Sequence, residues 1–414
     1  MANSSLHVAF CGLSGFPVST AASVNKMTAM ARGLAEAGCE VSIINRKGVI
    51  DPKRGLEDRP EGEHQGLRYY TAGGTLLRPK GFVKRNFLKV FGIFQEMALL
   101  MRLKRQRGLD VVVLDTPYLG VILLYWLLRF ILSYKLVYQY VEMRSEIRKP
   151  GKSRLEQWRH EQIDHRVIKW FDGVLPISSV LHEWVAQRKP DMPILRVPVL
   201  ADYNQFDLPK RPEREPYYLY CGSSAYFEVI FFILEAFEAL PDTNQTKLYL
   251  IIRGPKDKHE KVLARIAESP RHADIQVFSD LPYAELAHKY VDALGLLIPL
   301  RPTKQDAARF PYKVSEYLAT GNPVVTTNYG ELRGYFRDGE NGLVAESYEL
   351  AQYVEKLQYL VDHSAEAAAI GQAGYRMGIE QFHYARIGER FYRYLAQLTG
   401  RPVVPQPQPE VSVS

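Results

Sequence analysis

The sequence predicts an α/β protein with two doubly wound domains, each a parallel sheet with helices on both faces. Short apolar segments alternate with segments of helical periodicity along most of the chain, which favours buried parallel strands joined by helices. The 414 residues exceed one ordinary core and fit two domains of ~150–200 residues. A polar, proline-bearing stretch, 203–216, interrupts the alternation. We therefore expect an N-terminal domain over 1–205 and a second domain over 206–385.

The first series starts with a buried strand at 6–12, followed by a helix whose apolar residues recur at helical spacing up to the stop signal Gly38. The other strands expected in this domain are 41–45, 110–115, 135–141 and 172–178.

The second series has the same alternation of apolar strands and helical segments. Its strands are expected at 217–222, 247–254, 275–280, 293–300 and 322–328. A C-terminal helix over 386–400 is expected to pack back toward the first domain, and the proline-rich end, 401–414, to be a disordered tail. Both domains are thus predicted to be Rossmann-like, facing each other across a cleft.

Composition narrows the class of protein. Hydrophobic content of 46% and charged content of 24% are typical of a soluble globular chain. Three cysteines at unrelated spacings form neither a disulfide framework nor a metal motif, which favours a reducing cytoplasm. The net charge of +7 allows an anionic substrate or an acidic membrane surface, and no binding motif indicates nucleic acid. The first residues lack the pattern of a signal peptide.

The most hydrophobic stretch is 119–138. Arg129 and Lys135 interrupt it before the ~20 apolar residues that a membrane span needs. We expect a buried helix that runs into a strand.

The first turn, 11–20, contains Gly12 and Gly15. Their spacing differs from the dinucleotide fingerprint, and the second strand ends in Asn45 where an acidic residue would bind ribose, so a nicotinamide cofactor is not expected. The loop is interpreted either as a phosphate- or sugar-binding turn on the acceptor or donor side, or as a tight turn without a ligand.

The segment 310–331 combines charge with a helix boundary. Pro311 suits the start of a helix that Gly321 ends, and it places Lys313 and Glu316 on one face. A lysine near a helix N-terminus can bind an anion, and a carboxylate one turn later can accept two hydrogen bonds from ribose hydroxyls. From the residues alone, a surface ion pair worth ~0.3 kcal/mol is an equally good interpretation.

The pattern P-x-K-x-x-E-Y-L-A-x-G-x-P-V-V over 311–325, followed by a Gly–Glu turn and D-G-x-N-G, resembles the donor-binding segment of retaining GT-B glycosyltransferases, notably glycosyltransferase family 4. The likeness covers most of residues 6–395, strongly from 217 to 345 and loosely across 50–170. The resemblance implies the GT-B fold, a sugar-nucleotide donor linked to UDP or GDP on the C-terminal domain, and an acceptor on the N-terminal one.

Carried over by position, the resemblance assigns ribose binding to Glu316 and the diphosphate to the surroundings of Tyr312 and Lys313. The first strand of the second domain then contributes a turn to the donor site, and a later loop lies beside the base. Together with the nearby cations, the implied donor residues are Gly222, Ser223, Arg253, Asp280, Leu281, Pro282, Arg309, Tyr312, Lys313 and Glu316, of which Lys313, Glu316 and Arg253 are the catalytic candidates.

Two positions depart from that pattern. Ala308 stands where family members commonly carry an acid that contacts the donor sugar, and Asp306 is the nearest acid. The turn 222–228 lacks the arginine and lysine that neutralise the diphosphate in many members, which leaves Lys313, Arg309 and Arg253 for that role.

Transfer from such a donor builds negative charge on the leaving diphosphate, so cations aimed at it are the expected catalytic groups. No D-x-D motif occurs, and we expect neither a bound metal nor a separate cofactor. The resemblance implies a retaining reaction. Asp115, Glu142 and Glu146 are candidate acceptor-side acids, or else ordinary loop acids.

The segment 76–108 holds nine Lys/Arg residues and one acid, Glu96. On a helix starting at Val83, its polar side chains, Glu96 among them, fall within an arc of ~140°, and Phe91 and Phe94 face away. Such a helix either packs on its own domain or lies on an acidic membrane surface.

These observations predict a hexosyltransferase-type enzyme that moves a sugar to a glycan or lipid-linked acceptor, in polysaccharide or lipopolysaccharide assembly. It would act in the cytoplasm at the inner face of the plasma membrane. A GT-B sugar-nucleotide epimerase and a non-catalytic glycosyltransferase-like partner protein remain as alternatives.

Overall fold

The chain divides into two compact units. Unit 1 comprises Met1–Leu200 and Tyr384–Ser414, and unit 2 comprises Ala201–His383. The computed structural model describes residues 5–18, 21–50, 57–79, 81–145, 153–211, 215–241 and 245–403, without the side chains of 82–90 and 308. The first unit therefore ends at Leu200 where the sequence suggested 205, and the chain returns to it for its last helix.

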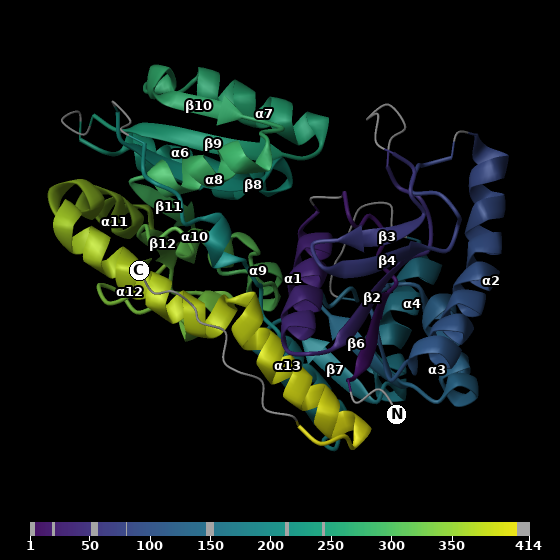
Figure 1. The fold of residues 1–414 in the computed structure, drawn as a ribbon. Coiled ribbons are helices and arrows are strands. Elements are labelled where there is room, and N and C mark those ends of the chain that lie inside the picture. Colours follow the sequence, from purple (N-terminus) through teal and green to yellow (C-terminus); the bar gives the residue numbers. More distant parts are fainter. Residues whose placement is uncertain are drawn as a thin grey trace. The chain divides into compact units, whose positions relative to one another are not determined.

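Unit 1 is built on a seven-stranded sheet in the order β3-β4-β2-β1-β5-β6-β7 (Figure 1). All neighbours are parallel except β3 and β4, which are antiparallel. The strands are β1 His7–Cys11, β2 Glu40–Asn45, β3 Glu61–His64, β4 Leu67–Thr71, β5 Val111–Leu114, β6 Lys135–Tyr140 and β7 Gly173–Pro176.

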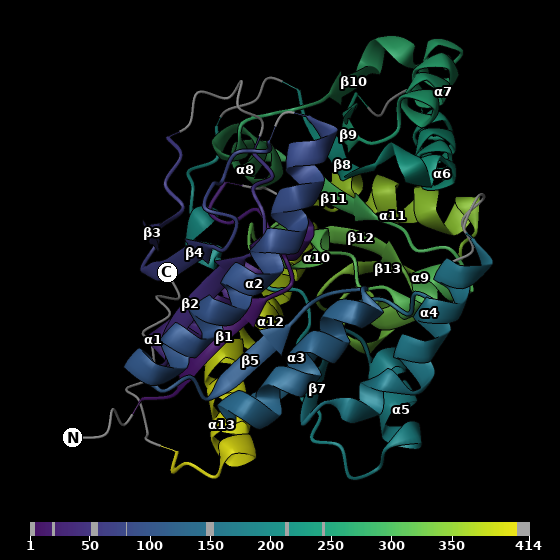
Figure 2. The same cartoon turned by 90° about the vertical axis from the view of Figure 1, so that its right-hand side faces the viewer.

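Helices cover both faces of this sheet. One face packs on α1 and α13, which share its hydrophobic core, and α2, α3 and α4 lie on the other (Figure 2). The helices of unit 1 are α1 Ala22–Glu36, α2 Phe82–Arg107, α3 Leu119–Leu132, α4 Arg154–His165, η2 Val167–Trp170, α5 Ser179–Arg188 and α13 Tyr384–Thr399.

Two glycines allow α1 and α13 to touch backbone to backbone. A Cβ added at Gly33 would lie 2.4 Å from the Tyr384 carbonyl oxygen, and one at Gly388 would lie 2.3 Å from the Gly33 carbonyl oxygen. Tyr384 at the start of α13 also donates a hydrogen bond to Glu36 on α1. The last helix is therefore an integral part of unit 1.

Unit 2 contains a six-stranded, fully parallel sheet in the order β10-β9-β8-β11-β12-β13. Its strands are β8 Tyr217–Ser223, β9 Lys247–Arg253, β10 Ile275–Phe278, β11 Gly295–Ile298, β12 Val324–Thr327 and β13 Leu343–Ala345. The helices are η3 Tyr203–Gln205, η4 Ser224–Tyr226, α6 Phe227–Glu238, α7 Lys256–Ala267, η5 His272–Asp274, α8 Tyr283–Asp292, α9 Lys304–Ala308, α10 Lys313–Leu318, η6 Gly330–Gly334, α11 Leu350–Asp362 and α12 Ser364–Phe382.

The predicted fold class is confirmed, since each unit has a parallel sheet of the doubly wound type. Every strand expected from an apolar run is present, with bounds within two residues of the expected ones. Three strands were not expected: the hairpin β3–β4 and the short edge strand β13. β3 is fully exposed and mostly charged, so it has no hydrophobic signal.

Two helices differ from expectation in what they bury. Glu96, assigned to the polar arc of α2, is 1% exposed and accepts hydrogen bonds from Arg46 and Tyr125, whereas Phe91 and Phe94 face solvent. The prediction for this helix was wrong because a buried arginine partner compensates the carboxylate. The stretch 119–138 does form a helix followed by a strand, but α3 is buried on one side only.

Candidate functional site

The strand order of unit 2 alone indicates where a ligand would bind. From β8 the chain winds one way through β9 and β10, and from β11 it winds the other way through β12 and β13. In open parallel sheets the loops at the carboxyl ends of the strands diverge at such a switch point and leave room for a ligand. The predicted donor residues lie in the last residues of strands of this sheet, in the loops that follow strands, or on and just before α10, which precedes β12.

Lys313 and Glu316 form an ion pair at the start of α10. The Lys313 ammonium lies 3.0 Å from Glu316 Oε2, and the Glu316 side chain is only 3% exposed while that of Lys313 is 28% exposed. Burial lowers the pKa of Lys313, but the Glu316 carboxylate and the Cys221 side chain together outweigh burial and raise the pKa above its usual value. A carboxylate this buried is not a surface ion pair, because its desolvation costs several kcal/mol.

The loop after β10 reaches the same carboxylate. Burial, the Glu316 carboxylate and the Tyr283 hydroxyl raise the pKa of Tyr312, in that order. Tyr283 directly follows Pro282, the last residue of the predicted base-side loop. The structure therefore places the end of this loop, Tyr312 and the Lys313–Glu316 pair near one another. Because α10 has only six residues, the positive charge of this site comes from Lys313 rather than from a helix dipole.

Asp306 is held away from solvent by two arginines. Its side chain is 0% exposed, and the Arg301 guanidinium donates to both of its oxygens, at 3.1 and 3.2 Å. Arg309 Nε lies 3.1 Å from Asp306 Oδ1. The carboxylate of Asp306 is thus engaged within unit 2, and it anchors the two arginines.

Arg309 also connects this cluster to the first strand of the unit. Its guanidinium carbon lies 4.1 Å from the centre of the Tyr226 ring, directly after the turn that contains Gly222 and Ser223. That turn carries no cation of its own, so Arg309 is a positive charge that reaches it from the opposite side of the switch point.

The turns after β8 and β9 approach each other closely. Gly254 adopts φ +154°, and a Cβ there would lie 2.3 Å from Ser224 Oγ and 3.0 Å from Ser223 Oγ. Arg253, just before it, forms an ion pair with Asp280, and both side chains are mostly exposed. Asp280 has φ +57°, a left-handed conformation that holds the loop Asp280–Pro282 in its turn.

In unit 1 the glycine loop is tied by Asn45. Gly15 N–H donates to the Asn45 side-chain oxygen at 2.9 Å, and the Asn45 amide donates to the Phe16 carbonyl at 2.8 Å. Gly12, at φ +95°, leaves no room for a Cβ, which would lie 2.3 Å from the Asp115 carbonyl oxygen. Asn45 therefore holds the loop in place. It occupies the strand end at which a dinucleotide-binding fold carries the acid that binds ribose.

Asp115 and Lys26 are two buried ionisable residues of unit 1. Burial raises the pKa of Asp115 to about 6, against the opposing effects of Arg144 and Lys26. Burial also lowers the pKa of Lys26 to about 7, and its ammonium donates to the Val197 carbonyl at 2.8 Å. Sequence reasoning missed Lys26, although its position one turn before the apolar Met30 on α1 was a usable signal.

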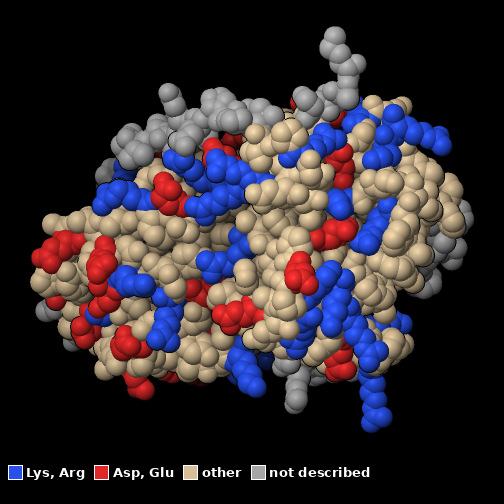
Figure 3. All heavy atoms as spheres, turned by 90° about the horizontal axis from the view of Figure 1, so that it is seen from below, with Lys and Arg blue, Asp and Glu red and all other residues tan. Residues whose placement is uncertain are grey.

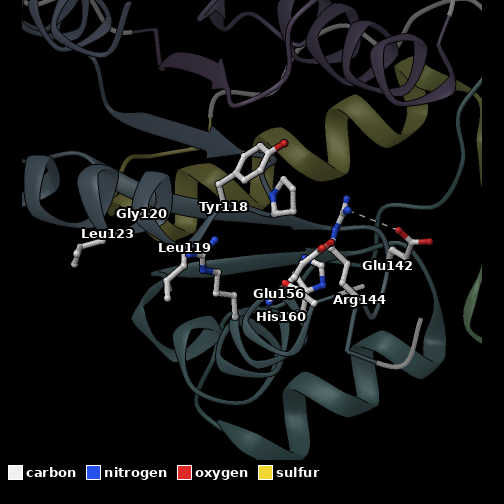
Figure 4. A pocket seen from close by; sticks show the side chains of 11 residues that line it. Tyr118, Leu119, Gly120, Leu123, Glu142, Arg144, Glu156 and His160 are labelled. Atoms are coloured by element: carbon white, nitrogen blue, oxygen red, sulfur yellow. Dashed lines mark hydrogen bonds and ion pairs between the residues drawn. The ribbon is translucent and has the colours of Figure 1, made fainter. Parts of the chain in front are cut away.

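A pocket of about 890 Å³ opens in unit 1 between the start of α3, the end of β6 and the start of α4 (Figure 4). Glu142 and Arg144 form an ion pair at 4.0 Å on one side, and Glu156 and His160 come from α4. Its size and its mixture of charged and apolar side chains suit a polar ligand. Glu146, the third predicted acid, lies outside the described residues.

Among the described residues, no group of three or more His, Cys, Asp or Glu side chains could hold a metal ion.

Solved structures with the same fold cover almost the whole chain. Sucrose-phosphate synthase from Thermosynechococcus elongatus has a TM-score of 0.71 at 17% identity, over 95% of this chain and 99% of that chain. Anabaena HepE in complex with UDP-glucose has a TM-score of 0.66 at 12% identity, over 95% of this chain and 100% of that chain. WaaG, a glycosyltransferase involved in lipopolysaccharide biosynthesis, has a TM-score of 0.60 at 15% identity, over 94% and 99%. Together these similarities establish the GT-B fold.

Residues 204–377 match the protein family described as "Glycosyl transferases group 1". The match coincides with unit 2 and includes the switch point, the Lys313–Glu316 pair and the Asp306 cluster. Among curated proteins, none matches the sequence. The protein is a glycosyltransferase with the GT-B fold.

Proposed function

We propose that the protein transfers a sugar from a UDP- or GDP-linked donor, held by unit 2, to a glycan or lipid-linked acceptor held by unit 1. The observation that carries the proposal is the buried Lys313–Glu316 pair at the carboxyl edge of the unit 2 sheet. A buried ion pair contributes little to stability in general, so its presence at a predicted ligand edge favours a role in binding.

The chemistry assigned to each group follows from charge. Glu316 accepts hydrogen bonds from the ribose hydroxyls of the donor, and Lys313 faces the diphosphate. As the glycosyl–phosphate bond breaks, negative charge grows on the leaving diphosphate, and Lys313, Arg309 and Arg253 stabilise it without a metal ion or a separate cofactor. Arg309 acts from the Tyr226 side and takes the place of a cation missing from the turn 222–228.

The acceptor belongs, in this proposal, to the pocket of unit 1. Glu142 lines it, and Asp115 lies deeper in the same unit near Arg144. With retention at the sugar carbon, the leaving diphosphate itself takes the acceptor proton, and these acids orient the acceptor hydroxyl rather than serve as an obligatory base.

The pathway is proposed to be polysaccharide or lipopolysaccharide-type biosynthesis at the cytoplasmic face of the plasma membrane. Among proteins of the same fold, WaaG is a glycosyltransferase involved in lipopolysaccharide biosynthesis, and HepE has been crystallised with UDP-glucose. Both facts support the choice of donor class and pathway.

The proposal is tested by incubating the protein with a panel of UDP- and GDP-sugars and glycan or membrane-derived acceptors, with products detected by mass. One donor is expected to give an acceptor product of the same anomeric configuration, and Glu316→Ala is expected to lose it. EDTA should leave the rate unchanged. Donor turnover without any acceptor would favour the epimerase, and a protein that binds no donor would contradict enzymatic function.

A further inference from the structure

The helix α3 is apolar around most of its circumference, yet only half of it is covered. Ile122, Tyr125, Leu128 and Leu132 face the core, while Leu123, Leu127, Phe130 and Ile131 lie on the opposite side and are exposed. Ile131 is 72% exposed and Phe130 61%. A helix that is hydrophobic all round is normally buried on all sides, but one side of α3 is not covered by the residues that the structure describes.

The single charged residue of α3 does not interrupt the exposed apolar side. Arg129 donates to the Trp170 carbonyl at 2.9 Å and to Asp172 at 3.1 Å. Its guanidinium also lies 4.9 Å from the centre of the Phe130 ring. The Arg129 guanidinium is thus bound by other groups of unit 1. The exposed side of the helix has leucine, isoleucine and phenylalanine side chains.

Neighbouring helices extend this surface. Figure 2 shows α2, α3 and α4 on the same side of the unit 1 sheet. Nine of the fifteen large hydrophobic side chains that are exposed in the described residues lie on these three helices or at the residue preceding α3. They are Phe91, Phe94, Tyr118, Leu123, Leu127, Phe130, Ile131, Leu155 and Trp158.

Tryptophans are concentrated in the same region. The chain has four, and Trp126 on α3, Trp158 on α4 and Trp170 after α4 are three of them. Trp126 packs against Phe130 at 5.1 Å and against Trp170 at 5.3 Å between ring centres. Tryptophan favours the boundary between water and hydrocarbon because its ring is apolar and its N–H is polar.

Positive charge accompanies the apolar surface. Residues 76–135, which include α2 and α3, contain eleven Lys/Arg and three Asp/Glu, whereas the whole chain has a net charge of only +7. The rest of the chain is therefore close to neutral. Figure 3 shows Lys and Arg side chains over the right-hand part of this view, with Asp and Glu side chains among them and uncharged surface along the edge.

We propose that this surface, formed by the outer side of α3 with α2 and α4 beside it, docks on a bilayer that contains anionic lipids. Leu127, Phe130 and Ile131 enter the boundary between headgroups and acyl chains, and the surrounding cations contact the lipid phosphates. The helix lies in the plane of the membrane: no helix in the described part of the chain is both long and apolar enough to cross one. The inference does not depend on the proposed sugar transfer.

Flotation with vesicles tests the docking surface. The full-length protein is expected to float with phosphatidylcholine vesicles that contain phosphatidylglycerol, less with phosphatidylcholine alone, and less in 0.5 M salt because screening weakens the headgroup contacts (~3–5 Å Debye length). Leu127→Gln with Ile131→Gln should lower the vesicle affinity at least tenfold. The matched control, Leu263→Gln with Val361→Gln, removes two exposed apolar side chains from unit 2 and should bind as the wild type does.

Two measurements keep the result interpretable. Thermal unfolding followed by tryptophan fluorescence should be the same for wild type and both variants, since the replaced side chains are exposed. Sedimentation velocity without vesicles should show the same monomeric species for all. Equal flotation of the α3 variant and the wild type, equal affinity for neutral and anionic vesicles, or self-association that only the α3 variant loses would each overturn the proposal.

Discussion

The two units place charge differently at the carboxyl ends of their sheets. In unit 2, charged side chains meet opposite charges: Lys313 pairs with Glu316, and Asp306 is held by Arg301 and Arg309. In unit 1, burial shifts the pKa of Asp115 to about 6 and that of Lys26 to about 7, so both are displaced toward their neutral forms. Unit 2 thus keeps full charges at its ligand edge, whereas unit 1 keeps groups that exchange protons near neutral pH.

This difference fits the division of labour proposed for the two units. A nucleotide diphosphate carries permanent negative charge and is best bound by groups that stay charged. An acceptor hydroxyl is neutral and is best oriented by groups whose ionisation is easily changed.

The largest effect is expected from Asp306→Ala, which tests the paired charges of unit 2. The substitution leaves Arg301 and Arg309 without their common carboxylate, and breaking such a buried pair costs roughly 3–5 kcal/mol. All four tryptophans lie in unit 1, so calorimetry should show a destabilised transition of unit 2 that tryptophan fluorescence does not follow. Asp257→Ala removes an exposed partner of Lys258 and serves as control, with an expected cost below about 1 kcal/mol. Equal effects of the two substitutions would contradict a stabilising role of the Arg301–Asp306–Arg309 cluster.

A smaller effect is expected from Lys26→Met, which tests the buried ionisable groups of unit 1. In the unfolded chain Lys26 has the usual lysine pKa of 10.5, whereas burial in the folded protein lowers its pKa to about 7. The unfolded state therefore binds more protons between about pH 7 and 10, so the wild type gains stability as pH rises through this range.

Lys26→Met removes this dependence and should stabilise unit 1 by roughly 2 kcal/mol below pH 7, since each unit of pKa shift corresponds to about 1.4 kcal/mol and loss of the contact with Val197 offsets part of the gain. The melting temperature from tryptophan fluorescence, measured from pH 6 to 10, reports this change in stability. Lys135→Met, an exposed lysine of the same unit, should leave the pH dependence unchanged. Parallel curves for Lys26→Met and wild type would show that Lys26 stays charged in the fold.

The smallest effect is expected from Arg253→Ala. Its pair with Asp280 is largely exposed, so the loss in folding stability should stay below about 1 kcal/mol. If the side chain also contacts the donor diphosphate, donor affinity should fall about tenfold, one charge-assisted hydrogen bond in magnitude. Lys256→Ala, an exposed cation at the start of α7, is the matched control. Unchanged donor affinity for Arg253→Ala would remove it from the catalytic candidates.

Much of the fold was predictable because buried parallel strands are continuous apolar runs, as in β1, β5 and β9. The hairpin β3–β4 was not, since the sequence of β3 is Glu-Gly-Glu-His, which has no apolar alternation, and the strand forms by pairing with β4. The exposed side of α3 was missed for a related reason. A sequence shows that a helix is apolar, but what covers it depends on how the chain packs.

The site was predictable where a local pattern carries it, and less so where partners come from afar. The i,i+3 spacing gave the Lys313–Glu316 contact, but not its burial. Asp306 was noted as a nearby acid, and its engagement by Arg301 follows from the turn between β11 and α9. Asp115 and Lys26, whose charges influence each other's pKa, are far apart in the sequence. The same is true of Glu96 and its ion-pair partner Arg46. Tertiary contacts of this kind leave no trace in local periodicity.

The central claim is that unit 2 binds a nucleotide sugar through Glu316. It is tested most directly by calorimetric titration of UDP, GDP and their sugars into wild type, Glu316→Gln and the control Glu366→Gln, an exposed glutamate with the same i,i+3 spacing to a basic partner, His363. The prediction is that one nucleotide class binds the wild type and the control alike, and that Glu316→Gln weakens it about a hundredfold, the effect of two charge-assisted hydrogen bonds to ribose. Equal binding by Glu316→Gln and wild type would contradict the claim.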